Sequence, residues 1–243
     1  MSWAGHNMWR NRSAAMYLGR GLCLLQVNGQ ALLRLEHSPT LPITAVLELL
    51  TERCKAIAIN LSGLQLKIDL SAALCSGYIL ANHSNPLTPV VRQQIAQTMR
   101  IPVSNLALRQ CAAQPQLVAG TTQALINTLS AWAMRHRVKM HAVQALWSTV
   151  THADRAKPSS IAAIILHEPD GATLFSQGTP ALVTPVWQYL ANQQEVNLQD
   201  IQRQLLQAQG LQASQAAVFK FLAKEGHAGE PGLSAWPAHW EAA

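Results

Sequence analysis

The sequence predicts an α/β protein with a mixed β-sheet, and two neighbouring segments carry that prediction. Residues 56–61 are apolar at nearly every position, which is typical of a strand covered on both faces. Residues 64–70 alternate strictly between apolar and polar side chains, which is typical of a half-buried antiparallel strand. A covered strand followed by a one-faced strand across a Ser62-Gly63 turn indicates a mixed sheet with helices packed on it.

The composition indicates a folded chain with a substantial apolar core. Hydrophobic residues make up 49% of the 243 residues, and charged residues make up only 12%. The charged fraction is about half of the roughly 25% that is usual in soluble domains, which argues against disorder and against nucleic-acid binding as the main task. The net charge of +6 permits contact with an anionic membrane surface or with nucleic acid without requiring it.

Neither the cysteines nor the apolar runs indicate a secreted or membrane-spanning protein. Cys23, Cys54, Cys75 and Cys111 are widely separated, match no zinc-site spacing and have apolar neighbours, so we expect reduced core residues rather than a disulfide framework. No run approaches the ~20 apolar residues of a membrane span, and the N-terminus shows no signal-peptide pattern. The sequence therefore predicts a cytoplasmic protein without a transmembrane segment of its own.

Turn and capping residues divide the first part of the chain into strands and helices. Asn28-Gly29 between two apolar runs predicts a type I′ hairpin turn, and Thr88-Pro89 predicts a capped helix start. The clearest helical periodicity places Leu125, Leu129 and Trp132 on one face. In order, we expect a short strand near residues 16–18, hairpin strands at 21–27 and 30–35, a helix at 42–53, the strand pair at 56–61 and 64–70, a helix at 90–99, a strand at 106–111, a helix at 118–134, a strand at 138–143 and a helix at 144–150.

A polar, proline-containing stretch at residues 151–160 is interpreted as a linker. A second hairpin follows it, with strands at 161–166 and 172–176 around a turn at Glu168-Pro169-Asp170-Gly171. The rest of the prediction is helices at 181–192, 198–209 and 214–225, and a division of the chain into an α/β subdomain at residues 1–150, a second α/β subdomain at 151–225 and a flexible, tryptophan-containing tail at 226–243.

The densest group of cations is Arg135, Arg137 and Lys139, at the end of the predicted helix 118–134. The helix dipole favours cations at this position, so a purely structural role is the simplest interpretation. Contact with a phosphate or with nucleic acid is the functional alternative, and it is disfavoured because no aromatic residues interleave the cations and no second basic patch supports nucleic-acid binding. His136 and His141 do not share a helical face, which argues against a metal site there.

The tail contains Trp236 and Trp240 on either side of Pro237. Two interpretations of this pair remain open. The indole rings fold back on the body of the protein as a hydrophobic clasp, or they anchor a protein partner.

No motif in the sequence is specific for catalysis. His152 and Asp154 place an imidazole near a carboxylate, an arrangement that orients general bases, yet no nucleophile turn accompanies them. Phosphate-binding loops of the GxxxxGK[ST] and GxGxxG types are absent from the sequence. We therefore assign no catalytic, metal or cofactor residue. A small hydrolase or transferase that uses His152 and Asp154 is the alternative function from the enzyme class.

The order of the predicted elements resembles that of the actin-like (ribonuclease-H-like) cytoplasmic platform proteins of type IV pilus assembly and type II secretion. Ile59-Asn60-Leu61-Ser62 before the alternating segment 64–70 is similar to the strand ending in Leu-Ser that is expected in that group. Residues 132–143 are similar to its long helix followed by a basic residue and a strand. The resemblance covers about residues 21–178. It implies an actin-like core, here with a helical C-terminal part.

The same resemblance implies a bacterial scaffold or adaptor that has lost ATP binding. Nucleotide-binding members of the superfamily carry an Asp-x-Gly loop in the first hairpin, whereas the turn at residues 27–29 has no aspartate. Asp170-Gly171 lies at the tip of the second hairpin without the expected continuation.

The function implied is therefore a pseudo-ATPase without a cofactor, cytoplasmic and peripheral at the inner membrane. Its implied partner is a protein, such as the cytosolic segment of an inner-membrane protein added as a strand to a sheet edge, and no nucleic acid is expected. The partner-binding candidates are Trp236, Trp240, Arg135, Arg137 and Lys139. A nucleic-acid-binding regulator that uses the three cations is the second alternative.

Overall fold

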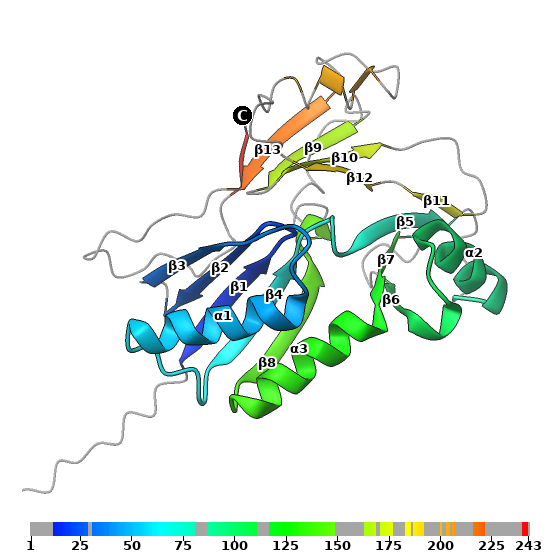
Figure 1. Ribbon diagram of the computed structural model, residues 1–243. Helices are drawn as coiled ribbons and strands as arrows, with labels where there is room; N and C mark the ends of the chain where they lie inside the picture. The colour runs from blue at the N-terminus through cyan, green and yellow to red at the C-terminus, as the bar shows by residue number, and fades with distance from the viewer. Residues whose placement is uncertain are drawn as a thin grey trace, which may run out of the picture.

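The described strands assemble into three sheets, and three α-helices lie between strands in the first part of the chain (Figure 1). The computed structural model describes residues 12–28, 31–80, 87–110, 117–148, 163–168, 171–176, 183–185, 187–191, 200, 203–204, 206–207, 216–221 and 240–242. The helices are α1 (Ile43–Ala56), α2 (Pro89–Met99) and α3 (Gln123–Arg135), with a 3-10 turn at Val103–Asn105. The strands are β1 (Ser13–Leu18), β2 (Leu22–Val27), β3 (Ala31–Glu36), β4 (Gln65–Leu70), β5 (Ser76–Leu80), β6 (Leu106–Gln110), β7 (Leu117–Thr122), β8 (Lys139–Ala145), β9 (Ala163–Glu168), β10 (Gly171–Ser176), β11 (Val183–Pro185), β12 (Trp187–Ala191), β13 (Ala216–Phe221) and β14 (Trp240–Ala242).

The first sheet contains five of the described strands, in the order β3-β2-β1-β4-β8. β1 pairs antiparallel with β2 and parallel with β4, and β8 pairs parallel with β4. Parallel neighbours need a crossover, which α1 supplies before β4 and α3 supplies before β8. Both helices lie on the same face of the sheet (Figure 1).

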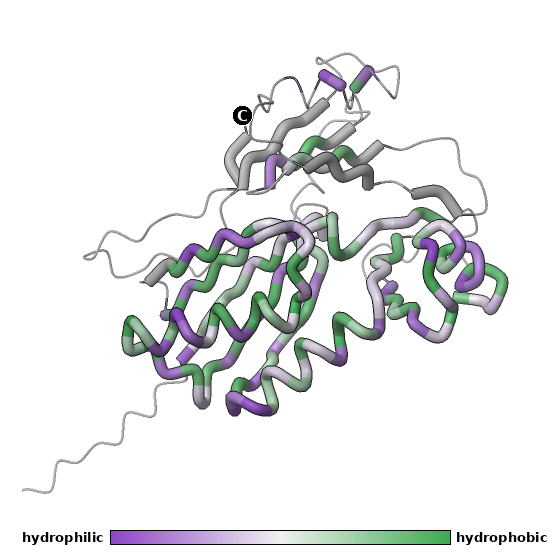
Figure 2. The backbone as a smooth tube through the Cα atoms, viewed as in Figure 1, coloured by the Kyte–Doolittle hydropathy of each residue, from purple (hydrophilic) through white to green (hydrophobic). Residues whose placement is uncertain are grey.

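The main core lies between the first sheet and these two helices. Leu47 and Leu50 of α1 and Leu66 and Ile68 of β4 are buried in one cluster. Trp132 Nε1 of α3 donates a hydrogen bond to Thr51 Oγ1 of α1 at 3.0 Å, which ties the two helices together. Figure 2 shows mostly hydrophobic residues along β2, whereas hydrophilic and hydrophobic residues alternate along β4.

The chain between β4 and α3 forms an inserted unit with a core of its own. In the described part of the chain, its strands form a sheet that β11 joins from later in the sequence, in the order β11-β5-β7-β6. α2 packs on this sheet through Ile95 and Val91, which are buried with Tyr78, Leu106 and Val118. Thr88 caps α2 as the sequence predicts, because its Oγ1 accepts a hydrogen bond from the Val91 N–H at 3.3 Å.

The third sheet, in the order β12-β10-β9-β13-β14 among the described strands, repeats the pairing pattern of the first. β9 pairs antiparallel with β10 and parallel with β13, as β1 pairs with β2 and β4. The second hairpin predicted from the sequence is therefore confirmed. Glu168 pairs with Gly171, so only two residues connect β9 and β10.

The predicted strand at residues 56–61 is wrong. α1 continues to Ala56, and the chain then turns through Ala58, whose φ of 58° is left-handed. The Ile59 N–H donates to the Cys54 carbonyl oxygen at 2.8 Å, and the Ala58 N–H donates to that of Lys55 at 3.1 Å. These bonds form a Schellman ending, in which the C3 and C″ residues are commonly apolar. The apolar run thus belongs to a helix end.

The alternating segment is a strand, but its predicted environment is wrong. β4 is parallel to both of its neighbours and lies inside the sheet, whereas a half-buried antiparallel strand was expected. Of its polar positions, Gln65 and Lys67 are half-buried and Asp69 is fully buried. Gln144 Nε2 of β8 donates to Asp69 Oδ1 at 2.7 Å, which compensates for the burial of the carboxylate. In the sequence, a buried polar residue that has a partner on another strand gives the same alternation of apolar and polar residues as an exposed one.

Other boundaries in the first half differ in detail. β1 is the middle strand of the first sheet, not a short strand in a lead-in. Residues 117–122 form β7, so α3 begins five residues later than predicted, at Gln123 with Thr122 as its cap. The predicted hairpin of β2 and β3 is confirmed, and Val27 pairs with Ala31, so its connection is longer than a two-residue turn.

The helical C-terminal part is mostly wrong. Residues predicted as helix at 181–192 contain β11 and β12, and those at 214–225 contain β13. The β-branched and aromatic residues in these segments, such as Val183, Tyr189 and Phe219, favour strands and outweigh the helical spacing. Within 198–209, the described residues 200, 203–204 and 206–207 are helical, as predicted.

Candidate partner-binding groove

A groove of about 640 Å³ separates the first sheet from the inserted unit. Residues 141–145 of β8 form one wall, and residues 107–110 of β6 form the other. Successive residues of a strand point to opposite faces of its sheet. Walls made of consecutive residues are therefore approached along the strand edge rather than across one face.

Both walls are the last strands of their sheets in the described part of the chain. β8 pairs with β4 on its inner side, and β6 pairs with β7 on its inner side. No described strand pairs with the outer edge of either one. Open strand edges are sites at which another extended chain adds by main-chain hydrogen bonds.

The pairing of β8 is irregular at the groove. Leu66 pairs with Met140 and Lys67 pairs with Ala142, which leaves His141 as an extra residue in β8. A β-bulge of this kind changes the direction of a side chain and is common beside binding sites. His141 is exposed and lines the groove.

The opposite wall is held by close packing around Gly120 of β7. A Cβ atom at this position would lie 3.0 Å from Tyr78 Cε2 and 3.2 Å from Leu108 Cδ2. A larger residue would crowd these two side chains, because Tyr78 of β5 and Leu108 of β6 approach each other across β7. This contact sets the position of Leu108, which lines the groove.

Two hydrogen bonds fix the floor of the groove. Trp147 is buried, and its Nε1 donates to the Cys75 carbonyl oxygen at 2.8 Å. Thr121 Oγ1 donates to the Leu74 carbonyl oxygen at 2.7 Å. Both bonds hold the segment after β4 against residues that follow or precede α3. The two walls are therefore joined below the groove.

The charge of the groove is positive or neutral. Among the described residues that line it, Arg109 is charged and exposed, and none is acidic. The carboxylate of Asp69 lies behind the wall, bonded to Gln144 and 3.8 Å from Lys67 Nζ. A bound segment with a carboxylate opposite Arg109 would meet an uncompensated cation there.

The three cysteines that the structure describes are buried thiols rather than candidate nucleophiles. Cys23, Cys54 and Cys75 are free and buried, as the sequence predicts, while Cys111 lies outside the described residues. Burial raises the pKa of Cys23 and of Cys75 to about 12 and that of Cys54 to about 11. The reactive thiolate is therefore scarce at neutral pH.

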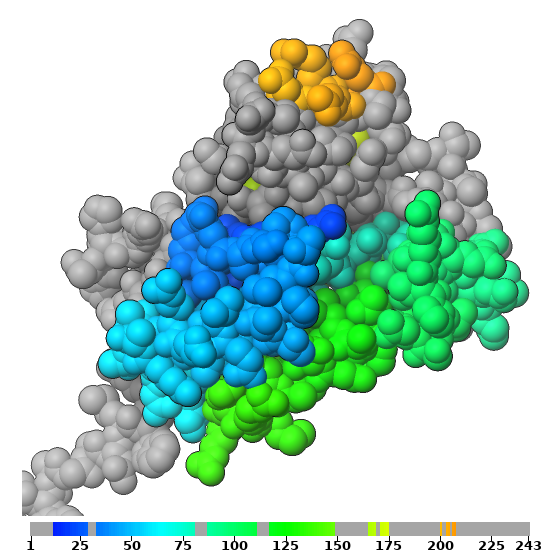
Figure 3. All heavy atoms as spheres, in the orientation of Figure 1, coloured from blue at the N-terminus to red at the C-terminus, as the bar shows by residue number. Residues whose placement is uncertain are grey.

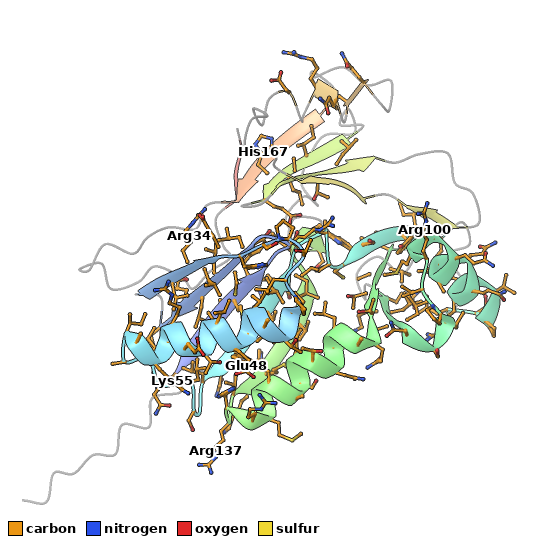
Figure 4. The ribbon with its side chains drawn as sticks, in the orientation of Figure 1. Arg34, Glu48, Lys55, Arg100, Arg137 and His167 are labelled. Atoms are coloured by element: carbon orange, nitrogen blue, oxygen red, sulfur yellow. The ribbon has the colours of Figure 1, made fainter. Side chains whose placement is uncertain are left out.

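The predicted cations Arg135, Arg137 and Lys139 lie at a different place, in the stretch where α3 ends and β8 begins. Arg137 is labelled there in Figure 4. Arg135 Nη1 donates to Glu48 Oε1 of α1. Arg135 and Arg137 line a second pocket, described below, and none of the three cations lines the groove.

Several other predicted residues lie outside the described part of the chain. Trp236, His152 and Asp154 are among them, so neither the tail clasp nor the alternative catalytic pair is placed. The backbone of Trp240 belongs to β14, where it pairs with Phe221 of β13.

A buried carboxylate joins the third sheet to the first. Glu168 at the end of β9 accepts hydrogen bonds from Thr173 Oγ1 at 2.7 Å, from Tyr17 Oη at 3.2 Å and from the Ala72 N–H at 3.3 Å. Tyr17 lies on β1, and Ala72 follows β4. The sequence shows Glu168 only as the start of a hairpin turn, and nothing local reveals its long-range partners.

The turn that corresponds to the Asp-x-Gly phosphate loop of the first hairpin is the one between β1 and β2, not the one at residues 27–29. Asn28-Gly29 follows β2, so it does not belong to the first hairpin of the structure. That hairpin turns at residues 19–21, and Gly19, Arg20 and Gly21 contain no carboxylate.

The described residues contain no group of three or more metal-ligating side chains. No helix among them is long and apolar enough to cross a bilayer.

No protein-family model and no curated protein matches the chain. Solved structures do match. The cytoplasmic domain of EpsL, an inner membrane component of the type II secretion system of Vibrio cholerae, has a TM-score of 0.46 and 8% identity, over 72% of this chain and 71% of that chain. A PilM–PilN type IV pilus biogenesis complex has a TM-score of 0.45 and 10% identity, over 82% of this chain and 66% of that chain.

A third solved structure carries the fold assignment, because its TM-score exceeds 0.5. It is a protein of unknown function with an actin-like ATPase fold from Bacteroides thetaiotaomicron. Its TM-score is 0.54, with 9% identity over 88% of this chain and 84% of that chain. The chain therefore has an actin-like α/β fold, which confirms the fold class predicted from the sequence.

Proposed function

We propose that the protein is a non-catalytic adaptor that binds an extended segment of a partner protein in the groove between β6 and β8. One observation carries the proposal: consecutive residues of two open strand edges line the same groove. A segment seated there pairs its backbone with the edge of β8, of β6 or of both. The bulge at His141 marks the point at which the β8 wall departs from regular pairing.

The lining residues define the chemistry of the segment. β6 presents five residues, which correspond to about 17 Å of extended chain. One side of the segment meets apolar groups such as Leu108, Ile126 and Trp147, and the other side meets Arg109 and His141. We therefore propose a partner segment of about five to seven residues with alternating apolar residues and at least one carboxylate.

We further propose that this segment belongs to the cytosolic part of an inner-membrane protein of a pilus or secretion assembly. The support is the resemblance of the element order, together with an actin-like fold. Residues 59–62 form a turn rather than the end of a strand, so the element order carries more of this resemblance than that string does.

Site-specific photocrosslinking tests the groove directly. A photoreactive amino acid replaces Ala107 on β6 or Ala142 on β8, and the variants are irradiated in a bacterial membrane extract. Val90, which is exposed at the start of α2, is the control position. We expect crosslinks from both groove positions to one short segment of one partner, and none from position 90.

Amide hydrogen exchange provides the second measurement. A synthetic peptide with the crosslinked sequence should slow exchange in residues 107–109 and 141–145 without slowing it in α2. Crosslinks that are equally frequent at position 90, or a bound peptide that leaves both strand edges unprotected, would refute the groove.

Thermal unfolding with ATP and magnesium tests the non-catalytic part of the proposal. The turn at residues 19–21 has no carboxylate, so we expect no shift in Tm. Binding at 100 times Kd would stabilise the native state by about 2.7 kcal/mol, which is a shift of a few degrees at this size. A shift of that size would show that the protein binds ATP and would contradict the proposal that it has lost nucleotide binding.

A further inference from the structure

A second pocket lies at the end of the first sheet where α1 and α3 finish. It has a volume of about 320 Å³. Lys55 from α1 and Arg135 and Arg137 from the end of α3 line it, together with polar residues of the connection between α1 and β4. Figure 3 shows that the atoms of these two helix ends, in cyan and green, meet along the lower edge of the molecule.

The pocket contains more cations than nearby carboxylates pair with in the described part of the chain. Arg135 pairs with Glu48. Lys55 and Arg137 have no acidic partner among the described residues, and both are exposed. Arg53 and Lys139 are exposed near the same helix ends and are also without an acidic partner in the described part of the chain. The end of the sheet therefore carries a local excess of positive charge.

Favourable interaction with helix dipoles explains only part of this arrangement. A cation in the last turn of a helix satisfies the dipole, as Lys55 and Arg135 do. Arg137 lies beyond the end of α3 in a left-handed conformation with a φ of 55°. Its side chain nevertheless lines the pocket, together with that of Lys55 from the other helix. Two helices thus contribute free cations to one concave site.

The pocket also offers hydrogen-bonding groups of a type suited to phosphate oxygens. Asn60 and Ser62 lie on its rim, and the Asn60 Oδ1 atom already accepts a hydrogen bond from the Ser62 N–H at 2.9 Å. His136 Nε2 is buried without a hydrogen-bond partner in the described part of the chain. A cationic site with hydroxyl, amide and imidazole groups recognises a phosphate better than it recognises a simple carboxylate.

An exposed apolar side chain stands beside the cations. Ile57 lies between the lining residues Lys55 and Ile59, and 56% of its surface is exposed. Among the described residues, only Val90 and Met134 are large apolar side chains with a greater exposed fraction. A free phosphate ion or a nucleic-acid backbone makes no apolar contact with an aliphatic side chain. In a lipid bilayer, by contrast, acyl chains lie directly below the phosphates and can contact it.

We propose that the ends of α1 and α3 dock on an anionic phospholipid bilayer, with a headgroup phosphate held between Lys55 and Arg137 and with Ile57 inserted into the interface. This site is distinct from the peptide groove and does not depend on the proposed partner. Positive charge near an anionic bilayer is attracted over a distance of about one Debye length, so the docking weakens as salt is added.

Vesicle sedimentation tests the proposal. Purified protein is mixed with vesicles of phosphatidylcholine alone, or of phosphatidylcholine with phosphatidylglycerol, at low and at high salt. We expect binding to the anionic vesicles at low salt and little binding to the neutral ones. Lys55→Ala and Arg137→Ala should each reduce partitioning about fivefold, and the double variant about 25-fold. Ile57→Ser should reduce it severalfold while leaving the salt dependence unchanged.

Two controls separate lipid docking from general charge effects. Arg100→Ala removes one exposed cation at the far end of α2 and should retain wild-type binding (Figure 4). Arg137→Lys keeps the charge and should retain most of the binding. An equal loss with Arg100→Ala, equal binding to neutral vesicles, or full retention by Ile57→Ser would overturn the proposal. Displacement from vesicles by inorganic phosphate, or tighter binding to a DNA duplex than to vesicles, would assign the pocket to another anion.

Discussion

The two walls of the groove belong to cores of very different size. β8 is part of the main cluster, which includes the buried faces of α1, α3 and β4, with Trp147 and Ala145 beside the groove. β6 is part of the small cluster in the inserted unit, which is built around Ile95, Tyr78 and Val118. The difference indicates one firm wall and one that adjusts, because local stability follows the amount of buried apolar contact.

This asymmetry suits a site that accepts an extended segment. In the proposed complex, the firm wall would hold the register of the bound strand, and the softer wall would adjust to its side chains. The five substitutions below probe the two walls and the cores behind them, from the largest expected effect to the smallest.

Trp147→Ala should have the largest effect because it removes a buried indole from the firm wall. Loss of this volume costs about 3–5 kcal/mol in the free energy of unfolding. The measurement is chemical denaturation followed by fluorescence and circular dichroism. Trp147→Phe keeps most of the apolar volume but loses the bond to the Cys75 carbonyl oxygen, and should cost less. A loss below 1 kcal/mol for the alanine variant would show that this wall is not firm.

Ile95→Ala should destabilise the softer wall by about 2–4 kcal/mol, since its side chain is fully buried in the small core. We expect faster amide hydrogen exchange in β6, β7 and α2, with α1 and β4 keeping their protection. Ile95→Val is the matched control with a smaller cavity. If exchange increases equally in α1 and β4, the two cores open as one unit and the comparison fails.

Gly120→Ala should cost about 1–3 kcal/mol through overpacking. The new Cβ would lie 3.0 Å from Tyr78 Cε2 and would push Leu108 toward the groove. Gly21→Ala is the control, because its Cβ would meet no atom closer than 3.7 Å. Thermal unfolding measures the stability, and crosslinking from position 107 measures the groove. Equal Tm values for both variants would contradict the close approach described here.

Ala58→Gly and Arg100→Gly should have the smallest effects, and both should be stabilising. Each residue ends a helix in a left-handed conformation, with φ of 58° and 56°. Glycine removes the steric cost of this conformation but loses more backbone entropy on folding, so we expect a net gain of about 0.5–1 kcal/mol. Ala58 follows α1 in the main core and Arg100 follows α2 in the small one. Denaturation midpoints should rise for Ala58→Gly, whereas Arg100→Gly should chiefly slow exchange in α2.

Local signals in the sequence were sufficient for much of the fold. The Thr88 cap, the hairpins and the periodicity of Leu125, Leu129 and Trp132 each depend on neighbours within a few residues, and the structure confirms them. The predicted strand at residues 56–61 failed because an apolar run satisfies a Schellman helix ending as well as a strand. The predicted helices at 181–192 and 214–225 were wrong because the β-branched and aromatic residues in these segments favour strands.

The candidate sites were harder to predict than the elements. Arg135 and Arg137 could be found as a cluster because they are only two residues apart in the sequence. The contribution of Lys55 to the same pocket depends on the packing of α1 against α3. The groove unites Arg109 with His141, whose strands belong to different sheets, so no spacing rule connects them. The hydrogen bond between Tyr17 and Glu168 likewise joins the first and third sheets, so the local sequence does not reveal it.

The position of β4 between β1 and β8 has a consequence for how the chain matures. Gln65 pairs with Ser13 on one side and with Lys139 on the other, so the whole inserted unit must emerge from the ribosome before β8 can dock. Closing so long a loop is entropically costly and slow. During that interval the edge of β4 lies open, and a nascent chain is then most prone to pair with the wrong strand. If the inserted unit folds early around its own core, it shortens the flexible chain between β4 and β8, and β8 then pairs with β4 sooner.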